Sequence, residues 1–467
     1  MNHQIENYIK LEKERAQNNL DIKSLCERLS YYSQIDGSLY EKYNVRRGLR
    51  YSDGSGVAAG ITNICSVHGY IIDEGIRTPI PGELIYRGYD INDLVENAEK
   101  EDRFVFEEVI YLLLFGQLPT KQELQNCENA LSIRRELPPG FLVDSIMQSP
   151  SKNIMNKLSR SILSLYSYDA CPDNTTIEDE MLIAINLIAK MPNLMNGAYQ
   201  TKRHKYDNAS MVMHQLRPEE KTAESILSLL RSDRQYTKQE AQLLDTMLAI
   251  HAEHGGGNNS TFACRVATSS GTDPYAAYAS AINSLKGPRH GGANLKVIEM
   301  LDDIKAHVKN WEDEGEVADY LTKILKKEAG DRSGLIYGMG HAVYTLSDPR
   351  AVILKRKAFE LAKGREIEPQ FRLLDLVEKL TPELMRSVRG IDKTVCANVD
   401  MYSGLVYRML GIPDDLFTPL FATARMVGWS AHRMEEILTG KRIIRPAYRT
   451  IAKRKKYIPI ETRTKAE

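Results

Sequence analysis

The stretch TKQEAQLLDTMLAIHAEHGGGNNS, from Thr237 to Ser260, contains the start, the buried face and the end of one helix. Thr237 and Glu240 have the spacing of a capping box, in which each side chain satisfies a backbone N–H of the other residue. Four residues at i, i+4, i+7 spacing then predict one buried helix face: Leu243, Met247, Ile250 and His254. Three glycines follow, and they let a backbone approach a ligand closely.

Similar helix signals recur along the whole chain. Asp or Thr before proline marks a helix start, and glycine after an apolar periodic run marks an end. The helices expected on these grounds are Phe104–Gly116, Thr176–Met191, Ala241–Ile250, Tyr275–Lys286 and two that begin at Asp348-Pro349 and Thr418-Pro419. These signals predict an all-α protein.

Strand signals are confined to one region near the N-terminus. Ile64 to Ile72 and Glu83 to Tyr89 are the clearest runs, and Pro81-Gly82 is the expected turn before the second run. We therefore expect one minor β excursion in an otherwise helical fold.

Composition excludes several classes of protein. Lys plus Arg and Asp plus Glu both number 62, and this zero net charge lacks the basic excess of nucleic-acid-binding or membrane-surface proteins. Six cysteines lie far apart without a C-x-x-C pair, which fits neither a disulfide framework nor a zinc site. The first 19 residues lack the apolar segment of a secretory signal, and no stretch has the length and apolarity of a membrane span. We expect a cytoplasmic protein.

The segment from His251 to Ser260 has several readings. His251 could be a core histidine, and His-x-x-His could be half of a zinc site, although no third ligand follows at typical spacing. His-x-Glu also opens a zinc deaminase signature, but the Pro-Cys-x-x-Cys half is absent. The glycine run is not a P-loop, because no Gly-Lys-Ser/Thr follows it.

Three further segments place chemically active side chains beside glycines or helix starts. Their sequences are GPRHGGAN from Gly287 to Asn294, GMGHAVYTLSDPR from Gly338 to Arg350, and NVDMYSG from Asn398 to Gly404. A helix start and a guanidinium at Arg350 both favour an anionic ligand. Asp400, taken alone, could be only a helix N-cap.

In this order, the four segments resemble the motifs of the citrate synthase family. The matching patterns are H-x-[ED]-H-x-x-x-N, G-P-x-H-G-x-A-N, G-x-G-H-x-V-Y-x-x-x-D-P-R and N-V-D-x-Y-S-G, with an early R-G-Y at Arg87–Tyr89. The resemblance covers about Gly37 to the C-terminus. It implies large and small helical domains: an N-terminal helical extension over 1–36, the large domain over 37–298 and 402–467, and the small domain over 299–401.

The resemblance also implies a reaction, the condensation of acetyl-CoA with oxaloacetate followed by hydrolysis of the thioester. Removing a proton from the thioester methyl needs a base and a partner for the enolate oxygen, and we assign these roles to Asp400 and His290. His341 is expected to polarise the ketone of oxaloacetate. The residues expected to bind the dicarboxylate are His254, Arg350, Arg425 and Arg445.

Coenzyme contacts are less completely matched. The resemblance assigns Gly338, Met339 and Gly340 to the coenzyme site, with acetyl-CoA as a substrate and no metal or redox cofactor. Thr345 stands where animal enzymes have a phosphate-binding arginine, and Lys355, Arg356 and Lys357 are the candidates to replace it.

Two alternative functions stay open on the sequence. The motifs do not separate acetyl-CoA from propionyl-CoA, the substrate of 2-methylcitrate synthase. A non-catalytic binding protein on the same scaffold is the other alternative, against which the presence of His290, His341 and Asp400 together argues. The family also implies a homodimer in which Arg445 reaches the partner's site. Asp400 itself lies near an expected helix start, whose dipole would keep the carboxyl ionised and weaken it as a base, whereas desolvation on domain closure could raise its pKa again.

Overall fold

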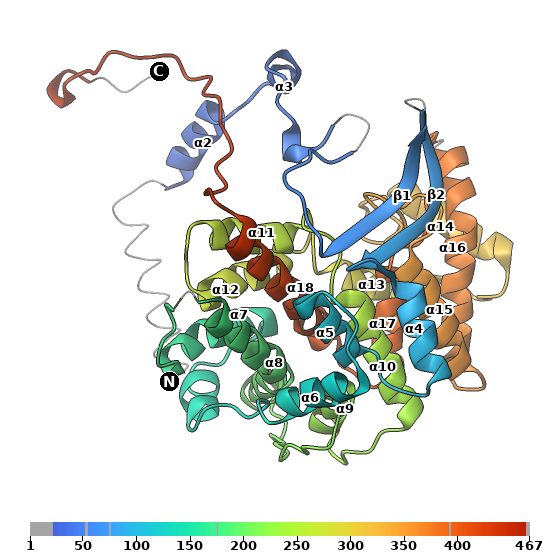
Figure 1. Ribbon diagram of the computed structural model, residues 1–467. Coiled ribbons are helices and arrows are strands. Elements are labelled where there is room, and N and C mark those ends of the chain that lie inside the picture. The colour runs from blue at the N-terminus through green and yellow to red at the C-terminus, as the bar shows by residue number, and fades with distance from the viewer. Residues whose placement is uncertain (1–21, 52–54, 74–75, 175, 392–393, 464–467) are drawn as a thin grey trace. The chain divides into compact units, whose positions relative to one another are not determined.

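The computed structural model describes residues 22–51, 55–73, 76–174, 176–391 and 394–463 (Figure 1). Its contacts separate two units, Met1–Ala59 and Gly60–Glu467. In the described part of the first unit, the chain forms helix α2 (Ile22–Tyr32), helix α3 (Ser38–Lys42) and a 3-10 turn at Arg47–Leu49. The helical extension expected over 1–36 therefore falls partly outside the described residues.

The second unit is built from helices, which confirms the all-α class. In chain order they are α4 (Ile91–Lys100), α5 (Phe106–Phe115), α6 (Lys121–Ser132), α7 (Ile154–Leu165), α8 (Ile177–Tyr206), α9 (Thr222–Leu230), α10 (Lys238–His251), α11 (Asn259–Ser269), α12 (Pro274–Leu285), α13 (Ala293–His307), α14 (Glu314–Leu325), α15 (Pro349–Ala362), α16 (Glu368–Arg389), α17 (Asp400–Met409) and α18 (Phe417–Thr439). No helix in the described ranges is both long enough and apolar enough to cross a membrane.

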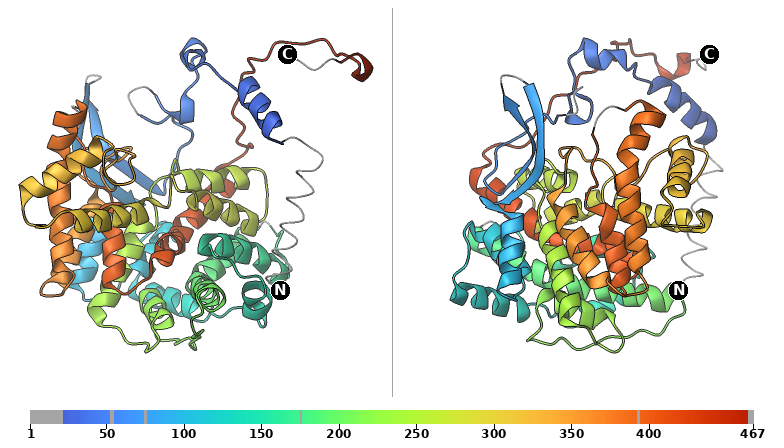
Figure 2. Two further views of the ribbon diagram at one scale, coloured as in Figure 1. Left: turned by 180° about the vertical axis from the view of Figure 1, so that it is seen from behind. Right: turned by 90° about the vertical axis from the view of Figure 1, so that its right-hand side faces the viewer.

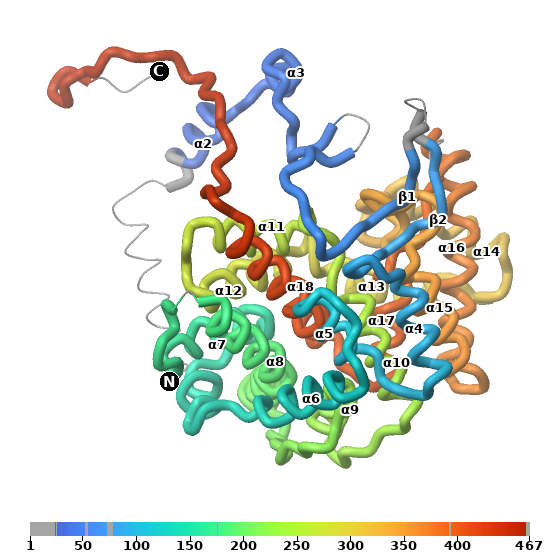
Figure 3. Tube along the Cα trace, viewed as in Figure 1, coloured from blue at the N-terminus to red at the C-terminus, as the bar shows by residue number. Residues whose placement is uncertain are grey.

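Helix α18 forms the centre of the core. It packs against α5, α7, α8, α10, α11 and α12, and Figures 2 and 3 show it running among these helices. Nearly every side chain from Phe417 to Met434 is buried, including the charged Arg425, His432 and Arg433. A helix buried on all sides must satisfy its polar groups within the protein, so its charged residues mark places where other segments dock.

Most helix starts lie where the sequence predicts them. Thr237 and Glu240 form both halves of the capping box of α10. Asp273 caps α12 through the N–H of Ala276, and Asp348 caps α15 through the N–H of Arg350. Such capping residues are reliable signals because each side chain accepts a hydrogen bond from a backbone N–H that has no partner within the helix.

Two helix boundaries differ from the prediction. Helix α8 does not stop near Met191 but continues through Pro192 to Tyr206, because the buried face on both sides of the proline packs against α18. Helix α18 begins at Phe417, before the expected Thr418-Pro419 start. The Thr418 hydroxyl instead donates to the carbonyl of Gly291, at 2.7 Å.

The β excursion is an antiparallel sheet of β1 (Cys65–Asp73), β2 (Ile76–Tyr86) and β3 (Tyr89–Asp90). The turn expected at Pro81-Gly82 is wrong, because both residues lie within β2 at a bulge where the register shifts between His68 and Tyr70. A bulge tolerates Pro81, whose nitrogen cannot donate to a neighbouring strand. Antiparallel pairing of Asp73 with Ile76 shows that the chain reverses between these two residues instead. A second reversal, between β2 and β3, lies at Arg87-Gly88, where φ is +50° and +93°, inside the run expected as one strand.

The bulge brings the sheet against the loop that follows His341. The N–H of Gly82 donates to the Ser347 hydroxyl at 3.1 Å, and the Tyr344 hydroxyl donates to the carbonyl of Glu83 at 3.1 Å. A Cβ on Gly82 would lie 2.2 Å from the Ser347 carbonyl oxygen, and one on Gly69 would lie 2.7 Å from the Val343 carbonyl oxygen. Only glycine permits this approach at these two positions.

We expect Gly82→Ala to lower the free energy of unfolding by about 1–3 kcal/mol, since the added methyl must displace the backbone of Ser347 or the sheet. Thermal and denaturant unfolding of the variant would measure the loss. Gly60→Ala is the matched control, because nothing lies within 4 Å of a Cβ at that position. Equal stability of the two variants would contradict a tight contact between the sheet and the loop.

Candidate active site

The turn from His251 to Gly255 lies at the end of helix α10, and hydrogen bonds to its backbone carbonyls from other segments hold it in place. The sequence predicts His254 on the helix face, but α10 ends at His251, so His254 lies in the turn. Three hydrogen bonds fix the turn: Tyr86 hydroxyl to Glu253 carbonyl at 2.9 Å, Arg425 Nε to His251 carbonyl at 2.7 Å, and Gly428 N–H to Ala252 carbonyl at 3.1 Å. The apolar spacing continues to His254, but the helix ends earlier because three glycines follow.

His254 lies beside His341. The two rings are 5.1 Å apart, centroid to centroid, and nearly perpendicular. Burial, and then the charge of Arg350, lower the pKa of His254 well below its usual value, so the ring is neutral. Its Nε2 is buried and has no hydrogen-bond partner among the described residues, which leaves it able to meet a ligand.

His341 is held in one orientation by its own loop. Its Nδ1 accepts hydrogen bonds from the backbone N–H groups of Val343 and Tyr344, each at 3.1 Å, and its ring stacks on Tyr344 at 4.6 Å. Because Nδ1 is an acceptor, the proton of the neutral ring is assigned to Nε2. His341 is thus a hydrogen-bond donor through Nε2.

The loop before His341 is joined to the segment before Asp400. Gly340 N–H donates to the Cys396 carbonyl at 2.7 Å, and Asn398 N–H donates to the Gly338 carbonyl at 2.8 Å. The Asn398 side-chain amide also donates to the Gly340 carbonyl at 2.9 Å. A Cβ on Gly338, whose φ is +82°, would lie 2.9 Å from Cα of Met401, so glycine is required here.

Asp400 is the first residue of α17, and its side chain is not the cap. Asn398 Oδ1 accepts from the Asp400 N–H at 3.0 Å, which rules out the simple N-cap reading of Asp400. Burial raises the pKa of Asp400 to about 6, although Arg350 and Arg425 lower it and Asp348 raises it further. Of the two opposing effects expected from the sequence, desolvation and the helix dipole, desolvation is therefore the stronger.

His290 lies in the turn between α12 and α13 and is oriented by Ser260. The Ser260 N–H donates to His290 Nε2 at 3.3 Å, and the Ser260 hydroxyl is 3.0 Å from the same atom. Trp429 Nε1 in turn donates to that hydroxyl at 3.2 Å. Burial, and then Arg425, lower the pKa of His290 to about 4, so the ring is neutral with its proton on Nδ1.

Arg350 and Arg425 provide two buried positive charges of different kinds. Arg350 is paired with Asp348 through two hydrogen bonds, Nε to Oδ1 at 3.0 Å and Nη2 to Oδ2 at 2.7 Å. Arg425 is fully buried, donates through Nε to the His251 carbonyl and lies 4.7 Å from the Phe421 ring. Neither Nη atom of Arg425 has a partner among the described residues. A guanidinium held in this state fits a planar carboxylate.

The charge of Arg425 reaches the other candidate groups, which places them around it. It lowers the pKa of His254, His290 and Asp400. Six of the seven predicted catalytic and substrate residues therefore converge: His254, His290, His341, Arg350, Asp400 and Arg425. The sequence did not reveal that Ser260, Tyr86 and Trp429 orient the converging residues. It also left open whether His251 was a core residue, and the ring nitrogens of His251 lack partners among the described residues.

Two sets of predicted residues lie outside this cluster. Arg445 is exposed in the segment after α18, where the neighbouring Ile444 N–H donates to Ser269 Oγ at 3.0 Å. The phosphate candidates are already paired: Lys355 with Glu378 at 2.8 Å, Arg356 with Glu99 at 3.1 Å and Lys357 with Glu99 at 2.6 Å. In this arrangement the three cations are not open to a phosphate.

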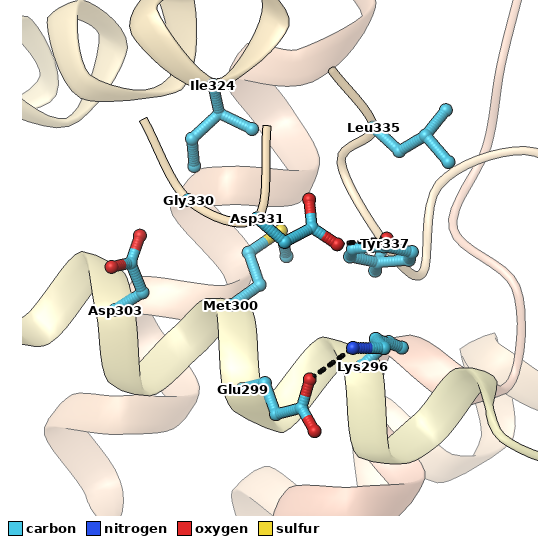
Figure 4. Close-up of a pocket in the computed structure, with 9 residues that line it drawn as sticks. All are labelled: Lys296, Glu299, Met300, Asp303, Ile324, Gly330, Asp331, Leu335 and Tyr337. Atoms are coloured by element: carbon cyan, nitrogen blue, oxygen red, sulfur yellow. Dashed lines mark hydrogen bonds and ion pairs between the residues drawn. The ribbon is translucent and has the colours of Figure 1, made fainter. Parts of the chain in front are cut away.

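A separate cavity of about 130 Å³ lies between α13, α14 and the loop that leads to Gly338 (Figure 4). Lys296 pairs with Glu299 at 2.6 Å on one wall, and the Tyr337 hydroxyl donates to Asp331 at 2.5 Å on another. None of the six converging residues lines it. Among the residues the structure describes, no three His, Cys, Asp or Glu side chains are grouped as a metal ion would require.

Comparison with known proteins gives concordant matches. A family model described as "Citrate synthase, C-terminal domain" matches residues 51–447. The citrate synthase of Acidithiobacillus ferridurans is 35% identical over 422 residues, which cover 88% of this chain and 97% of that protein. The protein named 2-methylcitrate synthase 1 of Corynebacterium glutamicum is 32% identical over 427 residues, covering 90% and 99%. The solved ternary complex of Thermoplasma acidophilum citrate synthase with carboxymethyl coenzyme A and oxaloacetate aligns with a TM-score of 0.71 and 27% identity, covering 89% of this chain and 100% of that one.

The raised pKa of Asp400 predicts that its charge destabilises the fold. The folded carboxyl titrates near 6 rather than near 3.8, so ionisation costs stability increasingly as the pH rises from 3.8 to 6, and the cost is constant above that. Asp400→Asn should therefore raise the free energy of unfolding at pH 7 by up to about 3 kcal/mol. The gain should shrink to nothing below pH 4 in denaturant titrations. Asp331→Asn is the control and should give no gain, because a hydrogen bond from Tyr337 lowers the pKa of Asp331.

Proposed function

Because this chain belongs to the citrate synthase family and catalyses the condensation of acetyl-CoA with oxaloacetate to citrate and CoA, we propose that Asp400, His290 and His341 are its catalytic groups. The observation that carries this assignment is the buried Arg425 guanidinium, whose Nη atoms have no partner among the described residues. Its charge acts on the base Asp400 and on the neutral rings of His254 and His290. A dicarboxylate ketone matches the charge of such a site, and an acyl thioester matches its base.

In the first step Asp400 removes a proton from the methyl group of acetyl-CoA. A carboxyl with a pKa of about 6 is ionised at neutral pH and is a stronger base than an exposed aspartate. The electron pair of the broken C–H bond moves into the thioester, and negative charge develops on its oxygen. His290 donates a hydrogen bond to that oxygen from Nδ1, because Ser260 occupies Nε2.

In the second step the enolate carbon attacks the ketone carbon of oxaloacetate. His341 polarises the ketone through Nε2–H, whose direction is set by the two backbone N–H groups at Nδ1. A carbon–carbon bond forms, and the ketone oxygen takes the Nε2 proton of His341 to become the hydroxyl of a citryl thioester. Solvent then returns a proton to His341 and takes the one that Asp400 removed from the methyl group. Water then cleaves the thioester, giving citrate and the CoA thiol.

Oxaloacetate is held by cations and neutral donors. Arg425 offers a forked pair of Nη atoms to one carboxylate. Arg350, at the start of α15, adds a second positive charge, which lies close enough to lower the pKa of Arg425. His254 adds a donor or acceptor at Nε2. Arg445, from the C-terminal segment, supplies a further charge from the partner chain in a homodimer.

Coenzyme binding is proposed at Gly338, Met339 and Gly340, and this proposal is supported by the open space beside Gly340, where a Cβ would have no atom within 4 Å. Acetyl-CoA enters as a substrate, and the steps above use only proton transfers and hydrogen bonds of the chain. We also propose a cytoplasmic enzyme, with the small domain over 299–401 and the large domain over 37–298 and 402–467. The proposed domain borders lie within α13 and α17, beside His290 and Asp400.

The proposed roles are tested by release of the CoA thiol when the enzyme is mixed with oxaloacetate and either acetyl-CoA or propionyl-CoA. We expect acetyl-CoA to give the higher kcat/KM. Asp400→Asn should lower kcat on the order of 10²- to 10⁴-fold while oxaloacetate still binds, because only proton abstraction is lost. For the wild-type protein saturated with oxaloacetate, kcat/KM for acetyl-CoA should fall as the pH drops through about 6 or a higher value, because the pKa of Asp400 is about 6 before oxaloacetate binds.

Either of two outcomes would contradict these assignments. Near-normal turnover of Asp400→Asn would remove Asp400 as the base. A higher kcat/KM with propionyl-CoA would favour the 2-methylcitrate synthase alternative, which relatives such as the Corynebacterium glutamicum protein keep open.

Sharing of the site between subunits is tested by mixing two inactive proteins, Asp400→Ala and Arg445→Ala, under conditions of subunit exchange. If Arg445 acts in trans, each mixed dimer has one site with both residues intact. About half of randomly paired dimers are mixed, so about a quarter of wild-type activity should return. If Arg445 acts within its own chain, no site in any pairing is whole, and an inactive mixture with verified exchange rejects the shared site.

A further inference from the structure

A chain of buried polar side chains runs behind the 251–255 turn, outside the groups used in the reaction. His432 lies on α18 two turns after Arg425, and both His432 and Glu253 are fully buried. His432 Nε2 is 2.9 Å from Glu253 Oε1. On the other side of the ring, Nδ1 accepts from Arg265 Nε at 3.0 Å and from Arg265 Nη2 at 2.6 Å.

Arg265 determines which nitrogen of the His432 ring carries the proton. It lies on α11 and is itself anchored to Glu435 and, at 2.8 Å, to Glu436. A guanidinium has no acceptor, so it can only donate to Nδ1. The proton of the His432 ring therefore lies on Nε2, and His432 donates to the Glu253 carboxylate.

Glu253 is held tightly against the helix backbone. Its Oε1 also accepts from the Gly255 N–H, and its Oε2 has no partner among the described residues. A Cβ on Gly428 would lie 2.1 Å from Oε2 and 2.4 Å from the Ala252 carbonyl oxygen. The absence of a side chain at Gly428 thus makes the space in which the carboxylate sits.

The charge on Glu253 is close enough to act on Arg425, yet the two do not pair. Burial lowers the pKa of Arg425, and Glu253 is the strongest group acting in the opposite direction. Among the described residues, the ion-pair partner of Glu253 is His432 and not Arg425. In a buried environment two opposite charges attract strongly, so something must hold them apart.

We propose that Arg265 and His432 are positioning residues that hold the Glu253 carboxylate away from Arg425, so that the Arg425 guanidinium stays open for a carboxylate of oxaloacetate. His432 acts as the donor that retains Glu253, and Arg265 keeps His432 in the donating orientation. Glu253 meanwhile provides a nearby negative charge that offsets part of the cost of burying Arg425 without occupying its Nη atoms. This inference rests on the proposed function, because it takes oxaloacetate as the ligand of Arg425.

The test is the affinity for oxaloacetate, measured by calorimetry, in three variants of the full-length protein. His432→Leu removes the donor, so Glu253 should turn to Arg425 and compete with the substrate; we expect Kd to rise at least about tenfold. Glu253→Gln removes the competing charge and should change Kd by less than about threefold. The double variant H432L/E253Q should return Kd to within about threefold of wild type.

Recovery in the double variant separates this role from a merely structural one. If His432 only supported the packing of the turn, adding Glu253→Gln would leave the affinity as poor as in H432L or make it poorer. Arg265→Met should give a smaller rise in Kd that Glu253→Gln also reverses, and it takes the place of H432L if that variant does not fold. His432→Gln, whose amide can still donate to Glu253, should keep the wild-type affinity.

A matched control lies one residue away on the same helix. Arg433 forms a buried ion pair with Glu180, with Nε 2.8 Å from Oε2, and does not face the 251–255 turn. R433M/E180Q should alter the thermal stability but leave the Kd for oxaloacetate unchanged. Unchanged affinity in H432L, or no recovery in H432L/E253Q, would overturn the inference. Failure of the proposed function would appear instead in the wild-type protein, as no binding of oxaloacetate.

Discussion

The buried guanidinium of Arg425, two of whose nitrogens have no partner in the part of the chain that the structure describes, is the constraint on which the site depends. An unpaired charge in a protein interior costs several kcal/mol, and the fold accepts that cost only because the surrounding contacts determine the position of Arg425 completely. Its Nε is bound to the His251 carbonyl, one face lies against Phe421, and α18 is buried on all sides. The remaining nitrogens are therefore directed at a ligand rather than at the protein.

Side chains and backbone groups of helix α18 also position site segments that are far apart in the chain. Thr418 holds the turn of His290 through Gly291, and Trp429 holds Ser260, which orients the His290 ring. Gly428 and Arg425 hold the backbone of the 251–255 turn. The loop of His341 and the start of α17 are joined separately, by backbone hydrogen bonds between residues 338–340 and 396–398. Two sets of contacts thus position the proposed site, one organised by α18 and the other carrying His341 and Asp400.

The sequence predicted features that depend on neighbouring residues. The capping box at Thr237 and the Asp-Pro starts of α12 and α15 form as expected, since a cap needs only residues within one turn. Pro192 and Pro81-Gly82 were misread because tertiary packing decides whether a proline ends an element, and here α18 and the loop after His341 supply that packing. The convergence of the four motifs was predicted by their resemblance to a family and could not follow from local rules. The contact between Glu253 and His432 escaped notice because a polar residue inside a helical core carries no local sign of its partners.

The charges of Arg350 and Arg425 also affect when Asp400 can act as a base. Arg350 and Arg425 lower the pKa of Asp400 in the free enzyme, while burial raises it to about 6. On the proposed assignment, oxaloacetate brings two carboxylates to these same arginines and neutralises their effect on Asp400. The pKa of Asp400 then rises further, and its carboxylate becomes a stronger base once the second substrate is in place. The arginines that bind oxaloacetate thereby restrain the base until oxaloacetate is bound, which favours enolate formation only where a ketone is present to accept the new bond.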